Sequence, residues 1–205
     1  LEARGPLLGK ARSRLESFDR RRVFLRGESI RKLKFAADVF DVVVSSLTWL
    51  DLPEPGRALS EFHRVLKPGG KVALAFPLHG TLEEIYDLFS EVTLKYELPE
   101  VQRSLEERLL RRHLEEEAAR QMLAGVGFEN ISLASKTEEI TFPAERRFFE
   151  APLIRALYVP HWQKAADVHA EELFKHTGAA IETYFGTEPF PVTIRAGCLV
   201  GEKPE

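Results

Sequence analysis

Polar residues that could do chemistry follow three apolar stretches of this sequence. His79 comes two residues after KVALAFP, Ser45 and Ser46 lie near the end of FDVVVSSL, and Glu28 and Ser29 follow RVFLRG. A neutral imidazole can take a proton from a hydroxyl or an amine, and carboxylate and hydroxyl oxygens accept hydrogen bonds from a polar ligand. His79 could equally orient a carboxylate, or be an ordinary exposed loop histidine.

Helices and strands alternate along the chain, and this alternation decides where those side chains lie. Apolar runs predict strands over residues 22–27, 40–47, 71–77 and 192–203, and two strands or one bent strand over 128–135 and 138–142. Amphipathic periodicity predicts helices over residues 7–17, 57–66, 82–124 with a break near Pro99, 144–158 and 164–185. The pattern is typical of an α/β fold with a parallel sheet, in which ligands bind at the carboxyl ends of the strands.

The strand predicted over residues 40–47 has a nearly continuous β-branched core. A run of this kind is typical of a parallel strand that is covered on both faces. The late helical pair before the last strand interrupts the alternation, and we expect it to form a cap over one end of the sheet.

The composition is that of an ordinary globular protein. With 205 residues, the chain is long enough for one domain with a sizeable core. Its single cysteine, Cys198, allows no intrachain disulfide, which favours a reducing, cytoplasmic setting. No apolar run approaches the roughly 20 residues of a membrane span, so we expect no membrane partner.

The formal net charge of −3 is too small to dictate a partner, but the charges are unevenly distributed. Residues 1–34 contain eleven Lys and Arg against four Asp and Glu. A solvated helix surface accounts for this excess, and an edge that faces a nucleic acid is the less favoured alternative. His169 and His176 are two helical turns apart with no third ligand nearby, so we expect no metal site.

A tight corner, Lys-Pro-Gly-Gly at residues 67–70, joins the second predicted helix to the strand that precedes His79. Proline cannot continue a helix, and glycine readily adopts the left-handed conformation that ends one. The corner alone predicts structure rather than function.

The sequence around the corner resembles the centre of class I S-adenosylmethionine-dependent methyltransferases. The resemblance covers roughly residues 1–80, 116–135 and 192–204. It is carried by the segments LEARGPLLGKARSRL, VFLRGESIRKLKFAADVFD, FDVVVSSLTWLDLPEPGRALSEFHRVLKPGGKVALAFP, RQMLAGVGFENISL and IRAGCLVGEKP. It implies a Rossmann-like sheet, mostly parallel with an antiparallel last strand, formed by residues 1–143 and 186–205, with residues 144–185 as a helical cap.

The resemblance also implies roles for individual residues. Glu2 matches the acidic residue that binds the ribose hydroxyls of the cofactor, and Glu28 matches the acid that accepts a hydrogen bond from its adenine amino group. The backbone of Ser29 would meet the adenine ring, and Ser45 and Ser46 would approach the methionine part. The family usually has Asp where this chain has Glu28, and SIRKLK departs from its usual pattern, so the adenine pocket could be altered or lost.

The family's first strand and its glycine-rich loop have no counterpart in this sequence. We expect the sequence to be part of a longer protein. The alternatives are that a partner chain or a second copy supplies the missing strands, or that the fold is reduced and does not bind the cofactor.

The predicted function is methyl transfer from S-adenosylmethionine to a small molecule or an acyl group. FPLHGTLEEIYDLF is similar to malonyl-carrier-protein O-methyltransferases. A catalytically degenerate interaction protein, and less readily an RNA methyltransferase, are the alternatives.

Overall fold

The computed structural model describes residues 6–15, 18, 23–25, 29–47, 52, 54–142, 145–186 and 188–205. Its strands are β1 (Phe40–Ser46), β2 (Leu66–Pro77), β3 (Glu129–Phe142) and β4 (Phe190–Glu202). Its helices are α1 (Pro6–Arg14), α2 (Pro55–Val65), α3 (Glu83–Lys95), α4 (Pro99–Arg112), α5 (Glu116–Ala124), α6 (Glu145–Glu150), α7 (Pro152–Leu157), α8 (Val159–Ala166), the 3₁₀ helix η2 (Asp167–His169) and α9 (Ala170–Phe185).

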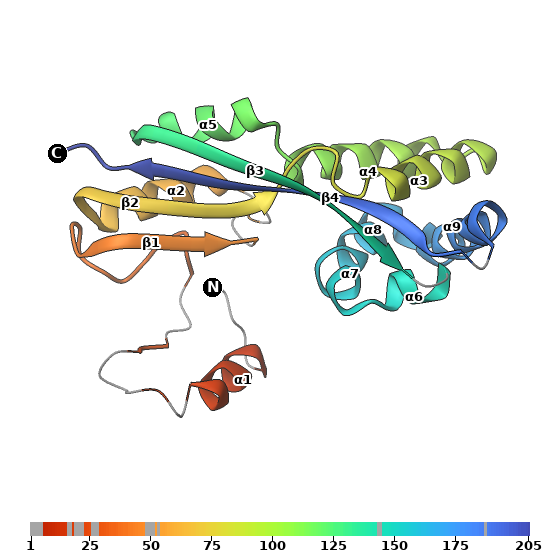
Figure 1. The fold of residues 1–205 in the computed structure, drawn as a ribbon, viewed down its shortest axis with the longest axis horizontal. Helices are drawn as coiled ribbons and strands as arrows, with labels where there is room; N and C mark the ends of the chain where they lie inside the picture. Colours follow the sequence, from red (N-terminus) through yellow and green to blue (C-terminus); the bar gives the residue numbers. More distant parts are fainter. Residues whose placement is uncertain are drawn as a thin grey trace. The chain divides into compact units, whose positions relative to one another are not determined.

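The four strands form one mixed sheet in the order β1-β2-β4-β3 (Figure 1). β1 and β2 run parallel, and β4 runs antiparallel to both of its neighbours. This arrangement confirms the predicted α/β class and the antiparallel last strand. Two strands or one bent strand were predicted over residues 128–135 and 138–142. The structure has one continuous strand there, β3.

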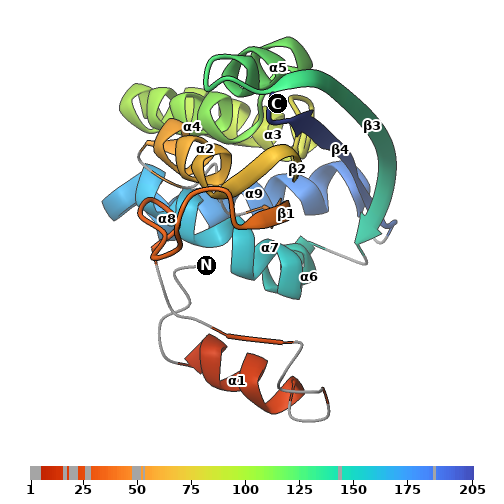
Figure 2. The ribbon, with the colours of Figure 1, turned by 90° about the vertical axis from the view of Figure 1, so that its left-hand side faces the viewer.

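The chain divides into two compact units. The first comprises residues 1–74, 120–132 and 199–205, and the second comprises residues 75–119 and 133–198. In the first unit, α2 lies beside β2 (Figure 2). One side of α2 is buried, formed by Ala58, Leu59, Phe62 and Val65. Alternate residues of β2, such as Val72 and Leu74, are buried as well. The burial follows the 3.6-residue and two-residue periods that the sequence shows.

β1 is covered on one face only, contrary to the prediction that both faces are covered. Val42 is 56% exposed and Val44 is 73% exposed, while Val43 between them is half-buried. Side chains alternate between the two faces of a strand, so the two exposed valines share the open face. β1 also ends the strand order of the described sheet. The described residues provide no element that covers this face, which explains the difference.

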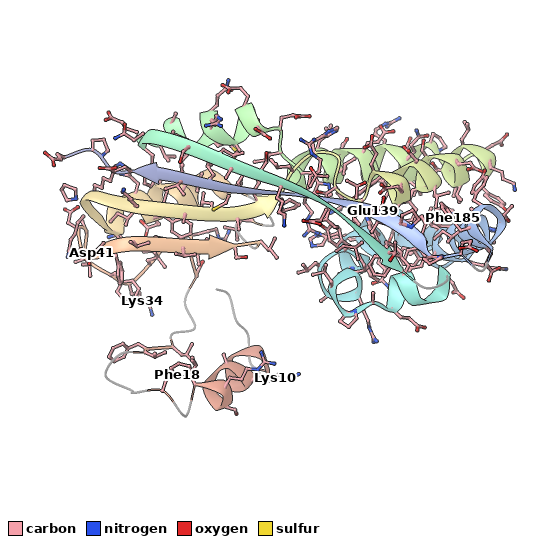
Figure 3. The ribbon with its side chains drawn as sticks, in the orientation of Figure 1. Lys10, Phe18, Lys34, Asp41, Glu139 and Phe185 are labelled. Carbon is pink, nitrogen blue, oxygen red and sulfur yellow. The ribbon has the colours of Figure 1, made fainter. Side chains whose placement is uncertain are left out.

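The second unit has a core rich in aromatic side chains. Trp162 of α8 contacts Phe89 of α3 edge-to-face, with 5.2 Å between ring centroids. Phe185 at the end of α9, labelled in Figure 3, meets Phe190 of β4 at 5.0 Å. Such geometries suit the charge distribution of aromatic rings. The Phe and Tyr residues at helical spacing in the late helices therefore pack mainly into this core.

The corner at residues 67–70 differs in detail from the prediction. α2 ends at Val65, and Leu66 is already extended, with φ −74° and ψ 140°, so no left-handed residue caps the helix. The left-handed conformation occurs three residues later, at Gly69, with φ 72°. Gly69 N–H donates to Lys203 O at 2.9 Å and Lys203 N–H donates to Gly70 O at 2.9 Å, so the corner pairs with the end of β4.

Two lysines, Lys203 and Lys67, form hydrogen bonds and ion pairs around this corner. Lys203 Nζ donates to Leu66 O at 2.8 Å and to Asp38 Oδ1 at 2.7 Å. Lys67 Nζ donates to Asp41 Oδ1 at 2.7 Å, and this contact lowers the pKa of Asp41 (Figure 3 labels Asp41 on β1). The corner is thus a junction of α2, β1, β2 and β4.

The strand predicted over residues 22–27 is not formed in its described part. Residues 23–25 belong to no strand, and the side chain of Phe24 is 76% exposed. A short apolar run makes a strand only where a neighbouring strand accepts its backbone hydrogen bonds. The described residues provide no such neighbour for this segment.

We predict that Gly70→Ala lowers the free energy of unfolding by about 1–3 kcal/mol, the usual cost of forcing extra atoms into a packed site. A Cβ at this position would lie 2.8 Å from Lys67 O and 3.2 Å from Asp41 O, so backbone would have to move. Urea unfolding followed by circular dichroism measures the change. Gly56→Ala in α2 is the control, because a Cβ there meets nothing within 4 Å. It should raise stability by up to about 1 kcal/mol. Equal effects of the two substitutions would contradict the prediction.

Candidate functional site

His79 lies two residues beyond the carboxyl end of β2, which ends at Pro77, and this is the position that the sequence predicted. Its backbone N–H donates to Leu114 O at 3.0 Å, and Leu78 forms a parallel bridge with Leu114. The imidazole is 43% exposed, and its Nδ1 lies 3.2 Å from Glu115 Oε1. A carboxylate in this position can hold the Nδ1 proton, which leaves Nε2 as the basic nitrogen.

The loop that carries His79 is fastened to β4 by Arg195. Leu78 N–H donates to Arg195 O at 2.8 Å, and Thr81 Oγ1 donates to the same oxygen at 2.7 Å. The Arg195 side chain completes the attachment, because Nη1 donates to His79 O at 2.9 Å. A Cβ on Gly80, where φ is 86°, would approach Arg195 Cδ to 3.0 Å. The loop is therefore held by hydrogen bonds on both sides of His79.

α3 begins next to this loop. Thr81 and Glu84 have the spacing of a capping box, but the helix starts at Glu83, and the hydroxyl of Thr81 bonds to Arg195 instead. Glu84 does not reach back to its own helix either. Its carboxylate accepts hydrogen bonds from the backbone N–H of Thr193, at 3.0 and 3.1 Å, and from the hydroxyl of Thr193 at 2.5 Å. Tertiary partners on β4 have replaced the local cap.

A second histidine lies on the segment that pairs with the His79 loop. His113 ends α4 and precedes Leu114, and its backbone N–H donates to Leu109 O at 2.8 Å. The side chain is 1% exposed, and neither ring nitrogen has a hydrogen-bond partner among the described residues. Burial, together with the charges of Arg112 and His79, lowers the pKa of His113 to about 3. The ring is neutral at pH 7.

Aromatic and cationic side chains surround His113. The rings of Tyr86 and Tyr158 lie 6.1 Å and 5.9 Å from its centroid in edge-on orientations. Trp162 Nε1 donates to the Tyr86 hydroxyl at 3.1 Å, and burial raises the pKa of Tyr86. Arg112 lies over the Tyr158 ring at 5.1 Å and donates to Leu157 O at 2.6 Å. The second unit therefore has a buried polar and aromatic cluster beside the His79 loop.

His113 is not among the predicted site residues, although the sequence contains a signal for it. Val101, Leu105, Leu109 and His113 are spaced four residues apart. This spacing continues the apolar face of α4, of which Val101 and Leu105 are buried, to its last turn. A histidine that continues an apolar face is expected to be buried, and its lack of partners could be seen only in the structure.

The predicted cofactor-binding residues belong to the first unit or lie outside the described residues. Ser45 is half-buried and Ser46 exposed at the carboxyl end of β1, and neither hydroxyl bonds to a described residue. Ser29 forms a turn, in which its Oγ accepts a hydrogen bond from Arg31 N–H at 3.4 Å. Glu2 and Glu28 lie outside the described residues. Strand-end hydroxyls that bond to no described group fit the polar amino-acid end of S-adenosylmethionine.

The described part of the chain contains no group of three His, Cys, Asp or Glu side chains that could hold a metal ion. His169 is paired with Glu172, 3.8 Å from Nδ1, and His176 Nδ1 lies 2.9 Å from the Tyr96 hydroxyl. Among the same residues, no helix is both long and apolar enough to cross a membrane.

Comparisons with known proteins show which proteins part of this chain is similar to. Residues 6–74 match the family described as methyltransferase domain. The ubiquinone/menaquinone biosynthesis C-methyltransferase UbiE of Shewanella sp. (strain ANA-3) is 28% identical over 116 residues, and that of Shewanella sp. (strain W3-18-1) is 31% identical over 116 residues. The aligned part is 53% of this chain and 46% of each relative, so the chain spans about half the length of the curated relatives it matches.

A solved structure shows the same fold. A protein from Bacillus halodurans C-125, provisionally described as a methyltransferase, superposes with a TM-score of 0.58 at 17% identity. The superposition covers 97% of this chain and 79% of that protein. Together, these comparisons confirm the predicted resemblance to class I S-adenosylmethionine-dependent methyltransferases and the Rossmann-like fold.

We predict that acid destabilises the wild-type protein more steeply than His113→Phe. Below pH 6.5 the unfolded chain protonates this ring, whereas the folded protein does so only near pH 3. The unfolded state therefore binds more protons in this window, and the free energy of unfolding falls as pH falls, by about 1.4 kcal/mol per pH unit between about pH 6 and pH 4. Tyr86 and Tyr158 contact the ring, the charges of Arg112 and His79 act on it, and all four residues remain in the variant.

Urea unfolding at several pH values, followed by circular dichroism, measures this difference. The comparison with His113→Phe cancels the carboxylates, which titrate in both proteins. Identical pH dependence in the two proteins would show that His113 is not buried in its neutral form.

Proposed function

We propose that this protein is an S-adenosylmethionine-dependent methyltransferase that acts on a small molecule or an acyl substrate. The observation that carries the proposal is the match of residues 6–74 to the methyltransferase domain family. The half-exposed histidine that follows the carboxyl end of β2 supports it, because ligands of open α/β sheets bind at this end of the strands.

The cofactor supplies an electrophilic methyl group on a sulfonium sulfur. For this chain we propose that Ser45 and Ser46 bind its methionine part, that Glu2 binds its ribose, and that Glu28 and Ser29 bind its adenine. The open strand-end hydroxyls at the end of β1 support the first assignment. The others rest on the sequence resemblance.

His79 would act on the methyl acceptor. Its Nε2 would take the proton from an acceptor hydroxyl or amine while that oxygen or nitrogen forms its bond to the methyl carbon. The Glu115 carboxylate would hold the Nδ1 proton and stabilise the imidazolium that results. The hydrogen bond that Arg195 donates to His79 O and the one that Leu114 O accepts from His79 N–H would fix the loop, so that alignment of the two reactants supplies much of the rate enhancement.

Two observations narrow the choice of acceptors to test. The curated relatives carry the name of C-methyltransferases of ubiquinone and menaquinone biosynthesis, which suggests a phenolic or quinone-like acceptor. The segment 76–89 resembles malonyl-carrier-protein O-methyltransferases, which suggests an acyl carboxylate. Hydroquinone and malonyl-N-acetylcysteamine are therefore suitable probes for the two classes.

Isothermal titration of the full-length protein with S-adenosylmethionine tests the proposal. We expect saturable binding with one site, and release of S-adenosylhomocysteine when an acceptor is added. Ser45→Ala should weaken cofactor binding several-fold, since it removes one hydrogen bond. Absence of binding at millimolar cofactor would refute the enzymatic function and favour a degenerate interaction protein.

We predict that His79→Gln lowers turnover by about 10²–10⁴-fold, the usual contribution of a general base, and leaves cofactor affinity unchanged. Steady-state release of S-adenosylhomocysteine and titration with the cofactor measure the two quantities. His169→Gln is the matched control, because His169 is 42% exposed and also lies beside a glutamate. It should behave like the wild type. Equal losses of turnover in both variants would argue against a specific role for His79.

A further inference from the structure

The imidazole of His113 is buried in the second unit with both of its nitrogens unpaired among the described residues, whereas Arg108 of the same unit leaves one buried nitrogen, Nε, unpaired. Both of its ring nitrogens are inaccessible to solvent and lack hydrogen-bond partners in the described part of the chain. Buried polar atoms are nearly always hydrogen-bonded, because leaving them unpaired costs stability. An imidazole that is only a packing element would be better replaced by an apolar ring.

The neighbours of His113 do not offer a replacement for the missing hydrogen bonds. Tyr86 and Tyr158 meet it with their rings, and the Tyr86 hydroxyl receives its hydrogen bond from Trp162. Arg112 points a guanidinium nitrogen at Leu157 O. The neutral ring of His113 therefore has one N–H donor and one nitrogen acceptor without a partner among the described residues.

The position of His113 connects it to the candidate site. It stands next to Leu114, which pairs with Leu78 and accepts the hydrogen bond from His79 N–H. Two residues beyond it, Glu115 contacts the His79 ring. The charge of His79 is also close enough to influence the titration of His113. One short segment therefore carries the partner of the proposed base and an unsatisfied imidazole.

We propose that His113 is a binding residue for the methyl acceptor. One nitrogen of its neutral ring donates a hydrogen bond to a substrate oxygen, and the other accepts one from a separate hydroxyl or amide N–H of the substrate. This proposal rests on the proposed function and extends it to the part of the substrate that does not react. Access to the ring requires the side chains of Tyr86 and Tyr158 to separate, so binding is coupled to a local rearrangement of the aromatic cluster.

The proposal predicts opposite effects of one substitution on stability and on binding. His113→Phe removes the unpaired nitrogens and keeps an aromatic ring, so we expect the melting temperature to rise by about 2–4 °C, the shift that corresponds to one relieved polar group in a chain of this size. In the same variant we expect kcat/KM for the acceptor to fall at least tenfold, mainly through KM. The affinity for S-adenosylmethionine should not change.

Three comparisons make the test specific. His113→Asn keeps a donor and an acceptor, so it should retain more kcat/KM than His113→Phe with malonyl-N-acetylcysteamine or hydroquinone as the probe. His113→Leu replaces His113→Phe if the larger ring does not fit. His63→Phe is the matched control, because His63 Nε2 is also buried without a described partner but belongs to the first unit. It should leave kcat/KM unchanged.

The outcomes separate this proposal from the proposed function. A lower melting temperature in both apolar variants would show that buried water or another group already satisfies the ring in the folded protein, and would overturn the proposal. Unchanged kcat/KM in His113→Phe would overturn it as well. Failure of the wild type to bind S-adenosylmethionine would instead refute the proposed function, and the melting temperatures would still report on His113.

Discussion

Residues 78–82 are tied to residues 193–195 of β4 through backbone and side-chain hydrogen bonds, and the candidate site depends on this attachment. Arg195 contributes its carbonyl, its N–H and its guanidinium, and Thr193 engages both Leu82 and Glu84. A loop on the surface of a sheet would ordinarily sample many conformations. Here the loop that bears His79 has little freedom, and the imidazole is positioned by backbone atoms as much as by Glu115.

The sequence was sufficient for the features that depend on local periodicity. The β-branched run predicted β1, and the apolar face of residues 57–66 predicted α2, within two residues at each end. His79 was predicted at the end of a strand and is found there. These predictions succeed because side-chain spacing and strand or helix geometry are linked within a single element.

Features that depend on distant partners were not predictable in the same way. Thr81 has the sequence of an N-cap, but its partner Arg195 is 114 residues away. The exposure of Val42 and Val44 depends on which elements lie against β1, and no pattern within β1 contains that information. His113 follows an apolar spacing, yet the absence of partners for its nitrogens is a property of the surrounding side chains.

The pairing of Lys203 with the corner after α2 has a consequence for how the chain folds. Its Nζ contacts Asp38, 165 residues earlier, and its backbone pairs with Gly69 and Gly70. During synthesis, α2 and β2 emerge from the ribosome long before β4, so their junction stays open until translation has passed this point. Contacts between residues so far apart in the sequence slow folding, because the intervening chain must lose conformational entropy before the stabilising contacts form. Until Lys203 has emerged, the corner after α2 lacks these partners, and the apolar side chains of a partly folded segment are prone to aggregate.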